Sequence, residues 1–200
     1  MDQNKTCNLC SAKISDSGDY DIRICENCLK NDIVIKDMNE GNIKDIPSMS
    51  DKYICRECLY YLKQKNDLKV KKDWIINMNK KYGSIGKILY YKTKPIAFCQ
   101  YTPKKELIRL EDLSKNSTKT DAWYILCLAV KSEYHGKDFA KLLLNEVLKD
   151  LKSRGITKVQ ACGMSKGDAG KFSSGYWSLY EKFEFKKISE DDEYVVGEKV

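Results

Sequence analysis

The run from Ala122 to Val130 constrains this chain most, because all nine of its residues are apolar. Nine residues are too few to cross a membrane, which needs about 20. A continuous apolar run of this length instead predicts a central strand that is covered on both faces of a sheet. Downstream, apolar residues recur at every fourth position from Phe139 to Leu151 and predict a core-facing helix that ends near Gly155.

The rest of the chain after residue 66 predicts a mixed α/β fold around this strand and helix. An amphipathic helix is expected over Lys71–Lys81, before two strands that form an antiparallel pair. A further strand, a short helix and a terminal hairpin are expected after the central helix. The expected strands are Ile85–Lys92, Pro95–Tyr101, Thr157–Cys162, Phe185–Ile188 and Tyr194–Lys199, and the expected short helix is Tyr176–Phe183.

Six of the nine cysteines form three Cys-x-x-Cys pairs near the start of the sequence. The first nine residues contain no apolar stretch of secretory type, so we expect a cytoplasmic protein in which such pairs bind metal rather than form disulfides. The pairs Cys7/Cys10 and Cys25/Cys28 are separated by 14 residues. Two tight turns at this spacing can bring four thiolates to one tetrahedral Zn²⁺, as in treble-clef and zinc-ribbon modules, which this segment resembles. A short hairpin is expected between them, with its turn at Asp16–Asp19.

The third pair, Cys55 and Cys58, leaves the metal assignment open. Six thiols are too many for one four-thiolate site and too few for two. We expect Cys7, Cys10, Cys25 and Cys28 to share the zinc, because their loop is shorter and less costly to close. The alternative joins Cys55/Cys58 to one of the other two pairs, and the pair left over is free, redox-active or completed by other ligands.

The composition divides the chain into two expected domains. Residues 1–66 have few long apolar runs, so bound metal would supply much of their folding free energy, and residues 67–200 form the larger domain. Residues 1–70 carry a net charge of −1, which argues against nucleic acid as the partner of the first domain. Residues 71–200 carry +8, spread along the segment, which fits either a solvated surface or attraction of a phosphorylated cofactor or another anionic partner.

The turn after the central strand predicts an anion site, since the start of a helix presents free main-chain N–H groups and a positive dipole end. Its sequence resembles the cofactor motif of the GNAT acetyltransferase superfamily, Arg/Gln-x-x-Gly-x-Gly/Ala. His135 stands at the Arg/Gln position, Asp138 at the first Gly position and Ala140 at the last small position. Pro95–Tyr101 resembles the third strand of that family, and Ser178–Lys187 resembles its last helix and the strand that follows.

This resemblance covers about residues 70–200 and implies a GNAT-like fold. It also implies an enzyme that transfers an acetyl group from acetyl-CoA directly to a primary amine. It implies that Tyr180 faces the thioester sulfur and protonates the departing thiolate. Asp121, Glu106 and Glu111 are candidate general bases, with none preferred. The amine acceptor and the oligomeric state stay open. The residues expected to bind the cofactor are Leu128, Val130, His135, Gly136, Lys137, Asp138, Phe139 and Ala140.

Two positions depart from the family pattern. Asp138 and Glu184 each stand where the family has glycine. A carboxylate at position 138 would repel a bound pyrophosphate unless it points away, and a side chain there restricts how closely a phosphate approaches the backbone. The second hypothesis is therefore a zinc-dependent protein-interaction module joined to a degenerate, non-catalytic domain that binds acyl-CoA.

Overall fold

The computed structural model describes residues 5–14, 19–48, 54–108, 121–165 and 174–200. The four α-helices in these residues are α1 (Glu26–Asn31), α2 (Leu68–Tyr82), α4 (Phe139–Ser153) and α5 (Trp177–Lys182). The strands are β1 (Ile33–Asp37), β2 (Gly86–Tyr91), β3 (Lys94–Pro103), β4 (Trp123–Val130), β5 (Val159–Met164), β6 (Lys186–Glu190) and β7 (Tyr194–Lys199). Short 3₁₀-helices are η1 (Asp19–Asp21), η2 (Ile43–Asp45), η3 (Cys55–Glu57), η4 (Tyr60–Leu62), η5 (Lys104–Glu106) and η6 (Ser132–Tyr134).

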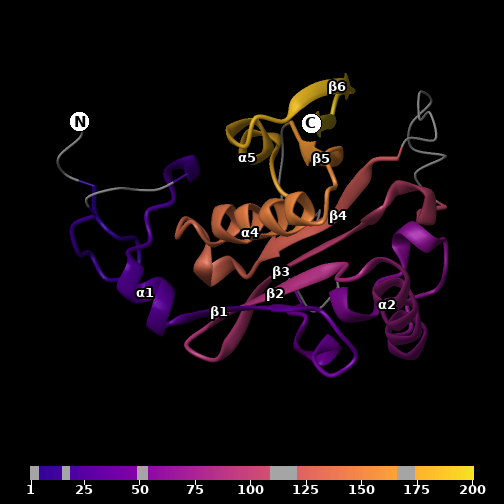
Figure 1. The fold of residues 1–200 in the computed structure, drawn as a ribbon, viewed down its shortest axis with the longest axis horizontal. Coiled ribbons are helices and arrows are strands. Elements are labelled where there is room, and N and C mark those ends of the chain that lie inside the picture. The colour runs from indigo at the N-terminus through magenta and orange to yellow at the C-terminus, as the bar shows by residue number, and fades with distance from the viewer. Residues whose placement is uncertain (1–4, 15–18, 49–53, 109–120, 166–173) are drawn as a thin grey trace.

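The strands form one mixed sheet of seven in the order β1-β2-β3-β4-β5-β7-β6 (Figure 1). Only β4 and β5 run parallel, and every other neighbouring pair is antiparallel. The crossover from β4 to β5 contains α4. The expected α/β fold with a strand-helix-strand unit at its centre is therefore confirmed.

Helix α4 packs across one face of the sheet, against β2, β3 and β4 (Figure 1). Its residues Leu143, Val147 and Leu151 are fully buried, as the four-residue repeat predicts. Helix α5 packs on β5 and β7. Gly163 on β5 permits this close contact, because a Cβ there would lie 2.7 Å from the backbone of Trp177.

The sequence placed most elements to within a few residues. Helix α2 starts earlier than expected because Asp67 caps it, accepting a hydrogen bond from the main-chain N–H of Val70 at 2.9 Å. Strand β5 begins two residues later than expected, because the chain needs residues 156–158 to return from the end of α4 to the sheet.

The N-terminal segment differs from the sequence expectation in two ways. Strand β1 was not expected, and it pairs with β2 at the edge of the sheet. The predicted hairpin is wrong: Asp19–Asp21 is a short 3₁₀-helix and residues 22–24 are not a strand, while residues 15–18 of its turn lie outside the described residues. The pattern of β1 was missed because Ile33–Asp37 is short and only partly buried. The division near residue 66 stays a prediction.

Strands β4 and β5 pair only at their beginnings. Trp123, Tyr124 and Ile125 pair with Val159, Gln160 and Ala161, and β4 then continues to Val130 while still paired with β3. From Leu126 onward, the edge of β4 that faces β5 has no strand partner among the described residues. The sheet therefore opens in the middle, next to the start of α4.

None of the described helices is both long enough and apolar enough to span a membrane.

Candidate functional site

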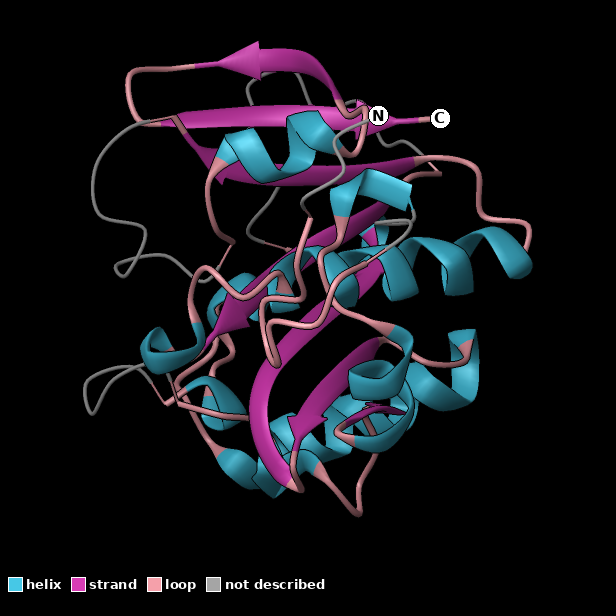
Figure 2. Cartoon of the chain, turned by 90° about the vertical axis from the view of Figure 1, so that its left-hand side faces the viewer, coloured by secondary structure: helices cyan, strands magenta, loops and turns pink. Residues whose placement is uncertain are grey.

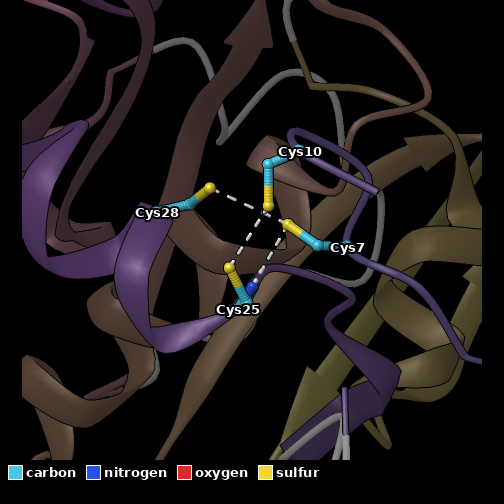
Figure 3. A group of neighbouring side chains, drawn as sticks. All are labelled: Cys7, Cys10, Cys25 and Cys28. Atoms are coloured by element: carbon cyan, nitrogen blue, oxygen red, sulfur yellow. Dashed lines mark hydrogen bonds between the residues drawn. The ribbon is translucent and has the colours of Figure 1, made fainter. Parts of the chain in front are cut away.

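Four cysteines of the N-terminal segment come together, two from the turn at residues 7–10 and two from the start of α1 (Figure 3). Their sulfur atoms all lie within 4.8 Å of one another. The Sγ atoms of Cys7 and Cys28 are 3.9 Å apart, and those of Cys10 and Cys25 are 3.6 Å apart. Ligands of a tetrahedral Zn²⁺ with Zn–S bonds of about 2.3 Å lie about 3.8 Å apart, so these residues fit the ion.

Main-chain N–H groups also point at this cluster. Those of Leu9 and Cys25 donate to the sulfur of Cys7, at 3.5 and 3.3 Å. Burial raises the pKa of the Cys7 thiol, but main-chain donors from Cys25, Leu9 and Cys10 outweigh it and lower the pKa to about 6. At Cys28, burial and the neighbouring thiols raise the pKa. Four thiolates this close repel one another, and a divalent cation would remove that repulsion.

The third pair lies elsewhere. Cys55 begins η3 and Cys58 follows it, and both line a pocket against α2. Among the described residues, only Cys7, Cys10, Cys25 and Cys28 form a group of three or more metal-binding side chains. The described part of the chain thus brings together the expected four cysteines and no alternative set.

The turn after β4 contains two residues in the left-handed backbone conformation, Gly136 and Asp138. Asp138 immediately precedes α4 and has a φ of 62°, in the left-handed region that glycine enters most easily. Gly136 has a φ of 74°. His135 is exposed, and its Nε2 lies 2.8 Å from the carbonyl oxygen of Val130, so its ring ties the turn to the end of β4. Phe139 is buried against Tyr91.

The Asp138 carboxylate points to the N-terminal segment and to the side chain of Lys141, not to the main-chain N–H groups of the helix that it precedes. Its Oδ2 accepts hydrogen bonds from Asn8 Nδ2 at 2.7 Å and from the main-chain N–H of Arg23 at 3.0 Å. Its Oδ1 lies 3.0 Å from Lys141 Nζ. The side chain makes no capping hydrogen bond to α4. Because the first N–H groups of a helix have no partner within it, those of α4 stay available to an anion.

Further contacts join the N-terminal segment to the domain. Lys141 Nζ donates to the carbonyl oxygen of Asp21 at 2.9 Å, and the ring of Tyr20 stacks on Phe183 with centroids 4.0 Å apart. Figure 1 places the segment beside the start of α4, and Figure 2 views the molecule from that side, with its loops in front of the sheet. Sequence analysis missed Asn8 and Arg23 because nothing in the sequence links them to a residue more than 100 positions away.

Leu128 and Val130 lie on the part of β4 that is paired with β3 but not with β5. The main-chain N–H of Lys131 donates to Ile96 of β3, and main-chain groups alternate in direction along a strand. Those of Val130 and Leu128 therefore turn toward the β5 side. Gly175, just before α5, is close on that side, since a Cβ there would lie 3.9 Å from the carbonyl oxygen of Leu128.

Tyr180 is fully buried on α5, and its hydroxyl donates to the carbonyl oxygen of Ser174 at 2.7 Å. Burial raises the pKa of its phenol, which therefore keeps its proton at neutral pH. Ser174 adjoins Gly175, so this hydroxyl lies near the open edge of β4.

The candidate general bases have different surroundings. Glu106 receives hydrogen bonds from Lys81 Nζ at 2.8 Å and from the Tyr82 hydroxyl at 2.5 Å. The bond from Lys81 lowers the pKa of Glu106, which holds it as a carboxylate. Asp121 is exposed before β4, and Glu111 lies outside the described residues.

Comparison with known proteins identifies the architecture. The family described as Acetyltransferase (GNAT) family has a sequence model that matches residues 52–185, more than half of the chain. The chain belongs to the GNAT family. The match extends upstream of residue 70, so it includes Cys55, Cys58 and the whole of α2. Asp138 and Glu184, at the positions where GNAT proteins carry glycine, have φ values of 62° and 64°, so the backbone keeps the glycine-like conformation at both.

Solved structures agree with this assignment at the level of the fold. An N-acetyltransferase from Staphylococcus aureus Mu50 has a TM-score of 0.58 at 13% identity, over 84% of this chain and 98% of that one. The ribosomal-protein-alanine N-acetyltransferase from Brucella melitensis has a TM-score of 0.58 at 13% identity, over 84% and 99%. PaiA N-acetyltransferase from Thermoplasma acidophilum, in complex with coenzyme A, has a TM-score of 0.52 at 17% identity, over 84% and 98%. No curated protein matches this chain.

The metal site of this GNAT protein can be tested by zinc analysis of purified variants. We expect about one zinc per chain in the wild type and in Cys55→Ser, because four thiolates complete a structural site. Cys7→Ser should lose most of the metal, because Cys7 supplies one of the four sulfur ligands and accepts hydrogen bonds from two main-chain N–H groups. Equal zinc in Cys7→Ser and the wild type, or loss in Cys55→Ser alone, would contradict the assignment.

Proposed function

We propose that this protein is an N-acetyltransferase that moves the acetyl group of acetyl-CoA to a primary amine, and that Cys7, Cys10, Cys25 and Cys28 hold a structural zinc. One observation carries the proposal. The Asp138 carboxylate is engaged by Asn8 and the main-chain N–H of Arg23, which leaves the first N–H groups of α4 to a diphosphate.

The binding roles follow from where each residue lies. Gly136 through Ala140 would present main-chain N–H groups to the diphosphate, with Lys137 and Lys141 nearby to offset charge. His135 would hold the turn to β4 through its contact with Val130. The main-chain groups of Leu128 and the main-chain N–H of Val130 would pair with the amide groups of the pantetheine arm, as an added strand pairs with a sheet edge.

Bound acetyl-CoA supplies a thioester whose acetyl carbon bonds to the amine nitrogen as the C–S bond breaks, and the proton lost by the amine balances the one gained by sulfur. Tyr180, whose phenol is held protonated near the open edge of β4, would turn its hydroxyl from the Ser174 carbonyl oxygen and donate its proton to sulfur. The proton that the amine releases would then restore the phenol. A main-chain N–H near Leu128 would polarise the thioester carbonyl.

The zinc would contribute indirectly, by holding in place the residues that donate hydrogen bonds to Asp138. Asn8 lies between two of the cysteines and Arg23 two residues before the third, so the metal would fix both donors. The module would thereby keep the carboxylate away from the diphosphate. We keep a cytoplasmic location as part of the proposal, since all nine cysteines lie in the described residues and none is in a disulfide.

Calorimetric titration with acetyl-CoA tests the cofactor site. Ala140→Glu adds a negative charge to the first turn of α4 and should weaken binding about tenfold or more, because the charge repels the diphosphate. Ser153→Glu adds the same charge at the far end of α4 and should leave the affinity nearly unchanged.

If wild-type protein binds no acetyl-CoA at millimolar concentration, the proposed function is wrong. Binding without transfer to any amine would instead favour the second hypothesis, a non-catalytic acyl-CoA-binding domain.

The Tyr180→Phe variant tests the proton donor. Loss of the hydroxyl should lower kcat by about 100-fold, while the Kd for acetyl-CoA stays nearly constant, because the hydroxyl acts on the leaving sulfur. Tyr176→Phe, at an exposed tyrosine just before the same helix, serves as the control and should retain the wild-type kcat. Equal kcat values for Tyr180→Phe and the wild type would remove the assigned role.

A further inference from the structure

The pocket that Cys55 and Cys58 line lies between the segment that carries this third cysteine pair and the sheet. Its cavity volume is about 30 Å³, enough for a small polar group. It is lined by η3, η4, α2, β3 and β4, and none of the described residues that line it is an aspartate or glutamate. The lining residues are Cys55, Cys58, Leu59, Tyr60, Tyr61, Leu62, Lys71, Trp74, Gln100, Leu126 and Cys127.

Lys71 is the only charged residue among the described residues of this lining, and it is 5% exposed. Its Nζ donates to the carbonyl oxygen of Cys58 at 2.9 Å and to Gln100 Oε1 at 2.8 Å. The Nζ also lies 5.2 Å from the centroid of the Trp74 ring. Within the described parts of the chain it makes no ion pair with a carboxylate. Burial lowers the pKa of Lys71, because a buried charge without a counterion is unfavourable.

Gln100, beside Lys71, has an amide group that lacks a hydrogen-bond acceptor in the described part of the chain. The residue is 2% exposed, its Oε1 is used by Lys71, and its Nε2 is buried without a hydrogen-bond partner among the described residues. A buried amide that makes no hydrogen bond costs about 1–3 kcal/mol. A water molecule could satisfy Gln100, but it would not supply the negative charge that Lys71 lacks.

These two side chains together define the ligand. Lys71 uses two of its three N–H bonds, and Gln100 offers an unused N–H₂ group beside it. Two donors and one positive charge call for a ligand with acceptor oxygens and a negative charge. A carboxylate has both, and it fits the small cavity.

The pocket adjoins the proposed reaction site. Leu126 and Cys127 form its wall, and they follow the last residue of β4 that pairs with β5. Cys127 is also the register partner of Gln100 on β3. We propose that Lys71 and Gln100 bind the carboxylate of the acceptor, so that the substrate is an amine with a carboxylate close to it, as in an α-amino acid. This inference rests on the proposed acetyl transfer.

The test compares three amines of similar size: L-alanine has a carboxylate, L-alaninamide has only a carbonyl, and isopropylamine has neither. Lys71→Met removes the charge at nearly constant volume and should lower kcat/KM for alanine about 10- to 100-fold, as expected for a charge-assisted hydrogen bond. It should change kcat/KM for the other two amines by less than about threefold. Because each amine is compared with itself in two proteins, differences in amine basicity cancel.

Two further variants complete the design. Lys72→Met alters the exposed neighbour of Lys71 and should change none of the three values. Gln100→Glu gives Lys71 a carboxylate partner inside the protein, so it should fold and should also lower kcat/KM for alanine selectively. Circular dichroism checks that each variant is folded. If Lys71→Met does not fold, Gln100→Glu alone decides the result.

The outcomes separate this inference from the proposed function. Selective loss of alanine acetylation supports it. It is overturned if the variants affect all three amines equally, if they affect none, or if the wild type binds acetyl-CoA and acetylates only isopropylamine or no amine of the three. Failure of the wild type to bind acetyl-CoA at all overturns the proposed function, and this inference with it.

Discussion

The contact between the Asp138 carboxylate and the N-terminal segment is the interaction on which the rest of the site depends. An aspartate before a helix ordinarily caps it, and here a cap would fill the position of an anion. Instead, Asn8 Nδ2 and the main-chain N–H of Arg23 donate hydrogen bonds to the carboxylate, in place of the N–H groups of the helix. The carboxylate is 9% exposed and also faces Lys141, so its charge is balanced where it lies. Asp138, whose charge would repel a diphosphate if it faced one, instead links the start of α4 to the N-terminal segment.

Strand β4 organises the remaining chemistry because its neighbours change along its length. It is paired on both sides at Trp123–Ile125 and only with β3 beyond that point. One edge of the later part is open toward α5 and Tyr180, while Leu126 and Cys127 also line the pocket that holds Lys71. The same short stretch of β4 thus borders both the proposed site of the pantetheine arm and the proposed site of the acceptor.

Local patterns in the sequence were enough to predict the elements and the family. The apolar run of β4, the four-residue repeat of α4 and the cysteine spacing each depend on neighbouring residues. The strand and the helix were confirmed and the four cysteines lie together, while their zinc stays a prediction. Long-range contacts were out of reach. Asn8 and Asp138 are 130 residues apart, and the sequence analysis used Lys71 only as the start of a helix. Its burial follows from the packing of η3 against α2, which no periodicity within the helix reveals.

A crystal structure with coenzyme A tests the central claim most directly. The account predicts that the diphosphate lies within hydrogen-bonding distance of the main-chain N–H groups in the first turn of α4, while Asp138 stays bonded to Asn8 and Arg23. A structure in which the Asp138 carboxylate caps α4, and the diphosphate lies elsewhere, would contradict it.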